Sequence, residues 1–274
     1  MTGDVSAPVK GAGEAGGGCH IFNGCGFPAP GLQDFNWKPL FTIGSFGFTK
    51  PMLLAILAAL VVIVFFWMAF RSPKLIPRGL QNLGEIAILA VRDQILRPSL
   101  GRRGDSYLPF LVSLFFFIYI MNVMELIPIF QFPVTSRIGF VWPLVFIVYF
   151  LYLYLGFKNQ GAWGYLRNMI PPGVPAPIYV ILVPVELLRF FVFQPFTLGV
   201  RLFGNMFAGH LLLTIFTIAT WYLLSLSVGL IYAAGSFALA IFVFLLETLV
   251  TLLQAFIFTT LTATYIASSL EASH

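Results

Sequence analysis

The sequence predicts an all-α polytopic membrane protein. Its 274 residues are 59% hydrophobic and only 9% charged, whereas a soluble domain carries roughly a quarter charged residues. Its longest apolar runs reach about 20 residues or more, the helix length that crosses a bilayer core roughly 30 Å thick. We therefore expect one membrane domain, residues 51–274, with about five membrane helices and one amphipathic helix at the membrane surface.

The segment before this domain, residues 1–50, is rich in glycine and proline and lacks the basic-then-apolar pattern of a secretory signal. It predicts an irregular segment outside the membrane. Cys19 and Cys25 bracket a short loop within it, where an oxidising compartment favours a disulfide and the cytosol favours two free thiols. His20 lies beside them, but three candidate ligands make a weak metal site, so no metal is expected.

Three predicted spans lie in the first part of the membrane domain. Between the first two, at about 79–97, an apolar block too short to cross the membrane has basic flanks, which favours a helix on the membrane surface. The alternative is a connecting loop with one helical turn. Asn122 and Glu125 share one face of the second span, and for Glu125 a functional and a structural role are equally open. The spans are about 52–70, 108–130 and 140–157.

Two much longer apolar runs follow, at about 178–226 and 228–270. As a helix, each would be over ~60 Å long at ~1.5 Å per residue, about twice the hydrocarbon thickness. The first run has no turn signature at its middle, because Pro195 predicts a kink rather than a loop. We therefore expect two long, strongly tilted helices that form a hairpin.

Lysine and arginine are distributed unequally between the two sides of these spans. Nine fall in the loops on one side and four fall on the other. Because cytoplasmic loops carry the excess, the N-terminus is predicted outside and the C-terminus in the cytoplasm, in a bacterial plasma membrane rather than a mitochondrial inner membrane. This orientation favours the disulfide. The net charge of +5 follows the topology and does not indicate a nucleic-acid partner.

An arginine stands within the fourth apolar run. A charge at the bilayer centre costs roughly 2.5 to 3.5 kcal/mol on insertion scales, so Arg201 needs a partner or a function. Its guanidinium keeps its proton and therefore supplies a fixed charge rather than a relay. Asn205 lies one turn further on, and His210 points to the opposite side of the helix. Glycines in this run, at 199, 204 and 209, would let another helix approach closely.

The last run carries a polar stripe. Glu247, Thr251 and Gln254 are spaced four and three residues apart, so they share one helix face, which must meet protein or water within a membrane. Histidine and glutamate can exchange protons near neutral pH, and amides and hydroxyls can hold water between them. The pattern predicts a proton path in which His210 and Glu247 form the mouth, Asn205 and Gln254 lie deeper, and Thr251 belongs to the stripe.

The inner end of this path would be Arg201, acting as an electrostatic barrier. The exit path on its other side is less clearly marked. Thr197, one turn before Arg201, is the best candidate, and Glu186 is a second one. Glu186 also stands three residues before Arg189, so an internal ion pair is the favoured interpretation of these two residues.

Two motifs carry a resemblance to a known family. Arg201 is followed by LFGNMFAG, and the last run contains ETLVTLLQAFIF at 247–258. In this order they resemble subunit a of the rotary F-type ATP synthases, most convincingly over residues 177–270. His210 and Glu247 stand in an order reversed relative to some bacterial members, which resembles the mitochondrial arrangement and preserves the pair.

The resemblance implies a function and a set of partners. In that family the subunit is the stator half of the proton path and has no catalytic site of its own. A carboxylate on each subunit of the rotating c-ring meets the arginine, releases its proton to one half-channel and is reloaded from the other, which couples proton flow to ATP synthesis. The implied partners are the c-ring, the peripheral-stalk subunit b, the lipid bilayer and protons, with no cofactor.

Three other functions are considered. An ion-coupled secondary transporter is the main alternative, but such folds usually repeat broken helices in two halves, and no such repeat is found. A membrane-embedded enzyme would need a nucleophile beside a base or a metal cluster, and neither is evident. A scaffold could bury Arg201 against Glu247 as a pair, but the chain has more intramembrane polarity than one pair needs.

Overall fold

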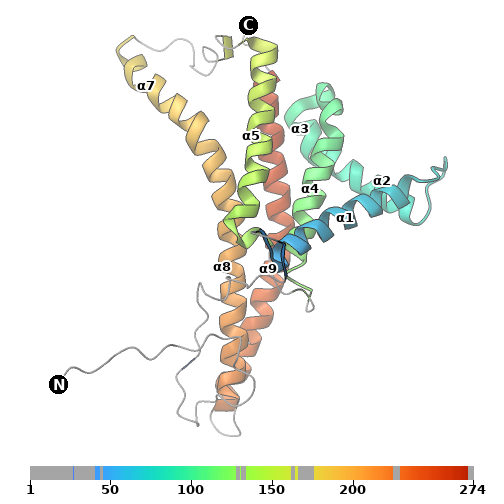
Figure 1. The fold of residues 1–274 in the computed structure, drawn as a ribbon, viewed down its shortest axis with the longest axis vertical. Helices are drawn as coiled ribbons and strands as arrows, with labels where there is room; N and C mark the ends of the chain where they lie inside the picture. Colours follow the sequence, from blue (N-terminus) through green and yellow to red (C-terminus); the bar gives the residue numbers. More distant parts are fainter. Residues whose placement is uncertain are drawn as a thin grey trace. The chain divides into compact units, whose positions relative to one another are not determined.

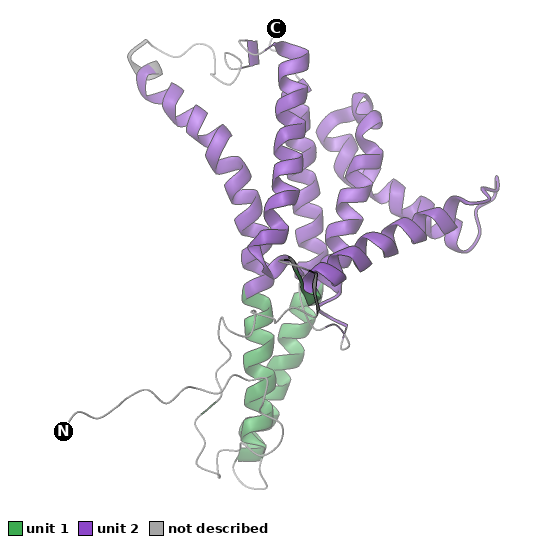
Figure 2. Ribbon diagram, viewed as in Figure 1, with its two compact units in different colours: residues 1–50, 208–248 green, residues 51–207, 249–274 purple. Residues whose placement is uncertain are grey.

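The structure is a computed structural model, and its described elements are nearly all helices (Figure 1). It divides into two compact units, residues 1–50 with 208–248 and residues 51–207 with 249–274 (Figure 2). Cys19 and Cys25 lie outside the described residues, so their disulfide stays a prediction. The described residues are 27, 41–43, 46–127, 130, 134–161, 164–165, 176–224 and 229–270.

The helices follow the apolar runs of the sequence. Pro51 stands in the first turn of the first helix, where its missing N–H costs no hydrogen bond. The first part of the domain contains α1 (Lys50–Phe70), α2 (Leu80–Val91), the π-helical turn η4 (Arg92–Leu96), α3 (Arg97–Leu100), the 3₁₀ helix η5 (Gly101–Tyr107) and α4 (Leu108–Val123). The second part contains η6 (Val134–Ser136), α5 (Ile138–Gln160), α7 (Ala176–Leu188), the π-helical turn η7 (Arg189–Phe193), α8 (Gln194–Leu223) and α9 (Gly229–Leu270).

Five of these helical stretches are long and apolar enough to cross a membrane, which confirms the predicted all-α polytopic fold. One of them, Leu80–Val123, combines the predicted surface helix with the second span. Within it, Gly101 has a φ of 62°, a left-handed conformation that favours glycine. The chain bends between α3 and α4 in Figure 1. The region at 79–97 is therefore helical as predicted, and its position at the membrane surface stays a prediction.

The second span ends earlier than the sequence indicated. Helix α4 stops at Val123, and a turn follows in which the Glu125 amide donates to the Asn122 carbonyl at 3.1 Å. The prediction that this span reaches residue 130 was wrong. Pro128 disfavours the α conformation of the residue before it and lacks a donor for a continuing helix. The Asn122 side chain instead accepts a hydrogen bond from the Thr135 hydroxyl at 2.7 Å, with both residues buried.

Two short strands stand where the sequence predicted irregular structure. β1 (Phe41–Ile43) pairs antiparallel with β2 (Phe46–Phe48), with Phe41 opposite Phe48. The two strands are separated by only two residues, Gly44 and Ser45, and the length of that connection is typical of a hairpin.

The fourth run continues through Pro195 without a loop. Proline removes one helical N–H and its ring clashes with the carbonyl four residues earlier. Here the π-helical turn η7 ends two residues before Pro195, and α8 resumes at Gln194. Such a wider turn accommodates the proline without ending the helix. The predicted pair of long helices is confirmed, since α8 has 30 residues and α9 has 42.

The larger unit has a core shared by helices from both ends of the sequence. Leu111 of α4, Ile95 and Leu96 of η4, and Ile266 of α9 are all buried in one cluster. Burying such a side chain stabilises the fold by roughly 1.5 to 3 kcal/mol. This cluster holds the C-terminal half of α9 against α4 and so fixes the helix that carries part of the predicted polar stripe.

Tyr165, which follows α5 in the chain, docks onto the end of α9. Tyr165 is buried, and its hydroxyl lies 3.1 Å from the Ser269 hydroxyl. The Tyr165 ring lies so close to Gly156 that a Cβ at that position would overlap it. The burial raises the pKa of the Tyr165 phenol above its usual range, and the hydrogen bond between Tyr165 and Ser269 opposes that rise.

Candidate functional site

In the larger unit, α8 carries two polar residues next to the face that packs inward. Leu198, Leu202 and Met206, spaced four apart, are at most 2% exposed, so they form the face that packs inward. Arg201 and Asn205 fall between them and are exposed. The helix period of 3.6 residues thus turns the arginine to the outer surface of the subunit.

Arg201 has no ion-pair partner in the part of the chain that the structure describes. The guanidinium therefore remains a positive charge displayed on an apolar helix, where neighbouring surface residues include Val200 and Phe196. A charge of this kind is expensive at membrane depth unless it serves a function.

The structure brings Asn205 and Gln254 together. The Asn205 side-chain nitrogen donates to the Gln254 side-chain oxygen at 2.9 Å. Gln254 is only 1% exposed, and its own side-chain nitrogen is buried without a hydrogen-bond partner among the described residues. A buried amide donor without a partner costs about 1 to 3 kcal/mol. The site therefore keeps a polar group that can bind water or pass a hydrogen bond onward.

The predicted polar stripe of α9 is buried. Glu247, Thr251 and Gln254 are each 1% exposed, whereas the neighbouring Leu249 and Leu252 are 66% and 49% exposed. The helix thus hides its polar residues and exposes its apolar ones, the reverse of a helix in a soluble protein. This arrangement confirms that the stripe faces protein, as required for polar groups in a membrane.

In the smaller unit, Glu247 lies directly against the backbone of α8. Its carboxylate is so close to Gly209 that a Cβ there would overlap it. His210 follows Gly209 in the chain and is half-buried. Nearby, the Ser236 hydroxyl of α9 donates to the Phe216 carbonyl of α8 at 3.1 Å. Gly209 and small buried residues on α9 therefore let the two helices of the hairpin approach closely within this unit.

Among the described residues, two of the three glycines predicted for close approach meet a neighbouring helix. A Cβ at Gly199 would lie 3.3 Å from Val145 of α5, and one at Gly209 would meet Glu247, but nothing lies within 4 Å of a Cβ at Gly204. Within the described residues no neighbour packs at Gly204, so its close approach to another helix stays a prediction.

The exit-path candidates occupy the beginning of the fourth run. Arg189 and Glu186 form the predicted ion pair, with 3.0 Å between Arg189 Nη1 and Glu186 Oε2. Thr197 is exposed on α8. Sequence reasoning missed Gln194, whose side-chain oxygen is buried without a hydrogen-bond partner among the described residues. The sequence signal that could have found it is a polar amide within an apolar run, one turn before Thr197 and next to Pro195.

Metal ligands do not gather anywhere in the described ranges: no group of three His, Cys, Asp or Glu side chains is close enough to hold an ion. The predicted site residues comprise a fixed cation, titratable side chains and hydrogen-bonding amides. Such a set can bind, orient and transfer protons.

Comparison with known proteins identifies the family. The family described as ATP synthase A chain matches residues 52–267, nearly the whole membrane domain. The chain belongs to this family. Its relatives include ATP synthase subunit a of Streptomyces lividans, 44% identical over 262 residues that cover 93% of this chain and 92% of the relative. Subunit a of Frankia alni is 40% identical over 89% of this chain and 86% of the relative.

A third relative, subunit a of Rhodococcus erythropolis, is 39% identical over 90% of this chain and 91% of the relative. These matches extend well before the two motifs at Arg201 and Glu247. They confirm the resemblance noted in the sequence and do not favour the secondary-transporter alternative.

Proposed function

We propose that this chain carries protons to and from ring carboxylates through two half-channels separated by Arg201. Membership of the family and five candidate membrane helices make the chain the proton-translocating stator subunit of an ATP synthase, a multi-pass membrane protein. The observation that supports Arg201 as the separator is its exposure on α8 without an ion-pair partner in the described part of the chain. Its charge is therefore available to a partner subunit.

The arginine acts on the carboxylate that approaches it. A cation within about 4 to 6 Å lowers the pKa of a carboxylate by roughly 1 to 3 units. A protonated ring carboxylate that reaches Arg201 therefore loses its proton to the adjacent half-channel, and the ionised form passes the arginine. The same fixed charge repels a proton moving along water, which prevents a direct leak from one half-channel to the other.

The inlet half-channel uses groups from both helices of the hairpin. His210 and Glu247 supply the titratable side chains that take up and release protons. Asn205 and Gln254, hydrogen-bonded at 2.9 Å, are the amides nearer the arginine in sequence, and buried Thr251 contributes a hydroxyl between them and Glu247 along α9. Together they hold the water through which a proton travels.

The exit half-channel begins on the other side of Arg201 along the fourth run. Thr197 supplies a hydroxyl one turn away, and Glu186 supplies a carboxylate that Arg189 keeps in place at 3.0 Å. The driving force across both half-channels is roughly 2.3 kcal/mol for each charge per 100 mV. Proton flow through this path turns the ring and so couples to ATP synthesis.

The assembly and orientation follow from the same function. The c-ring would face the Arg201 surface, and peripheral-stalk subunit b would bind elsewhere on the membrane domain. The excess of Lys and Arg in the loops on one side supports a bacterial plasma membrane, with the N-terminus outside and the C-terminus in the cytoplasm. An outside N-terminal segment would allow Cys19 and Cys25 to form a disulfide.

The deciding experiment is ATP-driven acidification of inverted membrane vesicles that carry Arg201→Ala. Arg102→Ala, which removes a cation from the connecting segment, is the control, and assembly of the complex is measured on the same membranes. We expect assembly in both variants and loss of acidification only in Arg201→Ala. Normal acidification by Arg201→Ala would make the arginine structural and overturn the proposed gate.

A further inference from the structure

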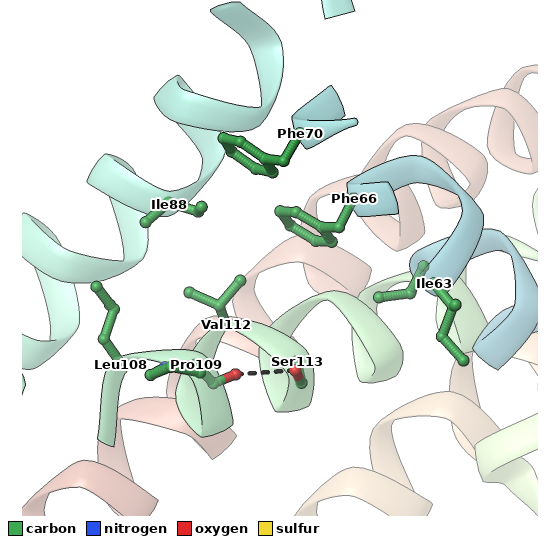
Figure 3. Close-up of a pocket in the computed structure, with 9 residues that line it drawn as sticks. Ile63, Phe66, Phe70, Ile88, Leu108, Pro109, Val112 and Ser113 are labelled. Carbon is green, nitrogen blue, oxygen red and sulfur yellow. Dashed lines mark hydrogen bonds between the residues drawn. The ribbon is translucent and has the colours of Figure 1, made fainter. Parts of the chain in front are cut away.

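A cavity of about 370 Å³ lies between α1, α2 and α4 in the larger unit. Figure 3 shows Phe66 and Phe70 of α1, Ile88 of α2 and Val112 of α4 turned toward it. Its polar lining side chain is that of Ser113, whose hydroxyl already donates to the Pro109 carbonyl at 2.8 Å. The cavity therefore offers an apolar surface and makes no demand for a polar ligand.

The cavity lies at one end of both membrane helices. Phe66 and Phe70 belong to the last turns of α1, while Leu108 and Val112 belong to the first turns of α4. The chain between these two ends is residues 71–107. With this connecting segment at the predicted membrane surface, an apolar molecule in the cavity would reach the end of the hydrocarbon region. Phospholipid headgroups occupy that level.

The connecting segment carries a strong positive excess. Residues 71–107 contain seven Lys and Arg against three Asp and Glu. Two of the cations are ion-paired, Arg92 with Asp93 at 3.9 Å and Arg97 with Asp105 at 3.2 Å. The other five have no carboxylate within 4.0 Å among the described residues, and they are Arg71, Lys74, Arg78, Arg102 and Arg103.

One of these cations stands immediately beside the cavity in sequence. Arg71 follows Phe70, and its guanidinium carbon lies 5.2 Å from the centre of the Trp67 ring. This cation–π contact keeps Arg71 at the end of α1, and Trp67 is itself the type of residue that sits at headgroup depth. A cation held there attracts a phosphate in the adjacent leaflet.

We propose that this cavity binds one acyl chain of an anionic phospholipid whose headgroup is held by the cations of residues 71–107. The volume suits part of a lipid, since ligand pockets span about 300 to 1,000 Å³. The uncompensated positive charge of the connecting segment selects an anionic headgroup.

The experiment uses the assembled complex in phosphatidylcholine vesicles that contain a minor fraction of phosphatidylglycerol with a photoreactive acyl chain. After illumination, lipid adducts are mapped along the chain by mass spectrometry. We expect adducts on the lining residues of α1, α2 and α4, which unlabelled phosphatidylglycerol removes by competition and phosphatidylcholine does not.

Two pairs of variants test the contributions of the cavity and of the positive charge separately. Ile63→Trp fills the cavity and should abolish these adducts, whereas Ile56→Trp, at a similarly exposed isoleucine of α1 outside the cavity, should leave them. Ile63 is 66% exposed and Ile56 is 54% exposed. Arg71→Gln should lower the preference for phosphatidylglycerol about fivefold, as for loss of one cation near an anionic surface.

The control for the charge is Lys158→Gln, which removes a cation that also lies over an aromatic ring, 5.8 Å from Tyr154, but on α5. It should leave the preference unchanged. Equal competition by both unlabelled lipids would contradict the preference for an anionic headgroup. Cross-links from the cavity to another subunit would show that a protein, and not a lipid, occupies it. Neither readout depends on proton transfer, so the inference can fail while the proposed proton path stands.

Discussion

The side-chain amide of Asn205 donates a hydrogen bond to the side-chain oxygen of Gln254 across 2.9 Å, joining two helices at residues 49 apart in sequence. Asn205 is exposed on α8, while Gln254 is 1% exposed on α9. The bond therefore links the surface that displays Arg201 to the buried polar residues of α9. A path for protons from the interior to the arginine needs such a link.

Removing this hydrogen bond should slow proton flow and leave the stability of the protein nearly unchanged. In Gln254→Leu, the Asn205 amide loses its acceptor, but a buried amide donor without a partner also disappears, so stability changes little. One lost hydrogen bond of this kind predicts a roughly tenfold lower rate of proton translocation. The measurement is passive proton flux through reconstituted complex.

Thr259→Val is the matched control, because that buried hydroxyl of α9 donates only to the Ala255 carbonyl of its own helix at 2.8 Å. It should keep the normal flux. A Gln254→Leu complex with normal flux would show that the hydrogen bond is structural.

Replacing the arginine by another cation should not preserve coupling. A lysine without water around it can lose its proton, and it lacks the planar fork of the guanidinium. Arg201→Lys is therefore expected to lower ATP-driven acidification nearly as much as Arg201→Ala, by roughly a hundredfold or more. Retained coupling in Arg201→Lys would mean that any positive charge at this position suffices.

Two glycines of α8 offer a matched test of the Glu247 position. A Cβ at Gly209 would overlap the Glu247 carboxylate, whereas a Cβ at Gly204 meets nothing within 4 Å. Both substitutions to alanine favour the helix by up to about 1 kcal/mol, so their difference isolates the carboxylate. We expect Gly209→Ala to lower acidification roughly tenfold to a hundredfold by displacing Glu247, and Gly204→Ala to assemble and pump normally.

A shorter acid tests the same displacement from the other side. Glu247→Asp withdraws the carboxylate by one methylene, so it should partly restore acidification in the Gly209→Ala background. Equal activity of the two glycine variants, or no gain in the double variant, would contradict a positioning role for Gly209.

The docking of Tyr165 predicts a pH dependence of stability. Burial raises the pKa of this phenol, so the folded protein holds the proton more tightly than the unfolded chain, whose phenol titrates near about pH 10. The stabilisation is complete below about pH 10 and is lost as the pH rises through the higher pKa of the folded state.

The measurement is thermal unfolding of the purified complex on both sides of about pH 10. Tyr165→Phe removes the titration and also the contact with Ser269 at 3.1 Å. We expect a lower unfolding temperature than wild type at neutral pH and a smaller loss above pH 10. If the unfolding temperature of Tyr165→Phe falls as much above about pH 10 as that of wild type, the loss of stability comes from other groups.

The sequence by itself determined those features that depend on local order along the chain. Apolar run lengths predicted the helices because a bilayer sets the length of a span. The spacing of Glu247, Thr251 and Gln254 placed them on one face, and the three-residue spacing of Glu186 and Arg189 predicted their ion pair, because the helix period alone decides such neighbours. The two motifs around Arg201 and Glu247 indicated the family because each is a contiguous stretch of sequence.

The tertiary structure alone decided which residues of different helices meet. The pairing of Asn205 with Gln254, the contact of Gly209 with Glu247 and the open space at Gly204 all depend on how each helix is rotated about its axis. That rotation is set by close packing of side chains along the whole interface, and no single residue records it. The early end of α4 is a similar case, since the buried bond between Asn122 and Thr135 replaces another helical turn.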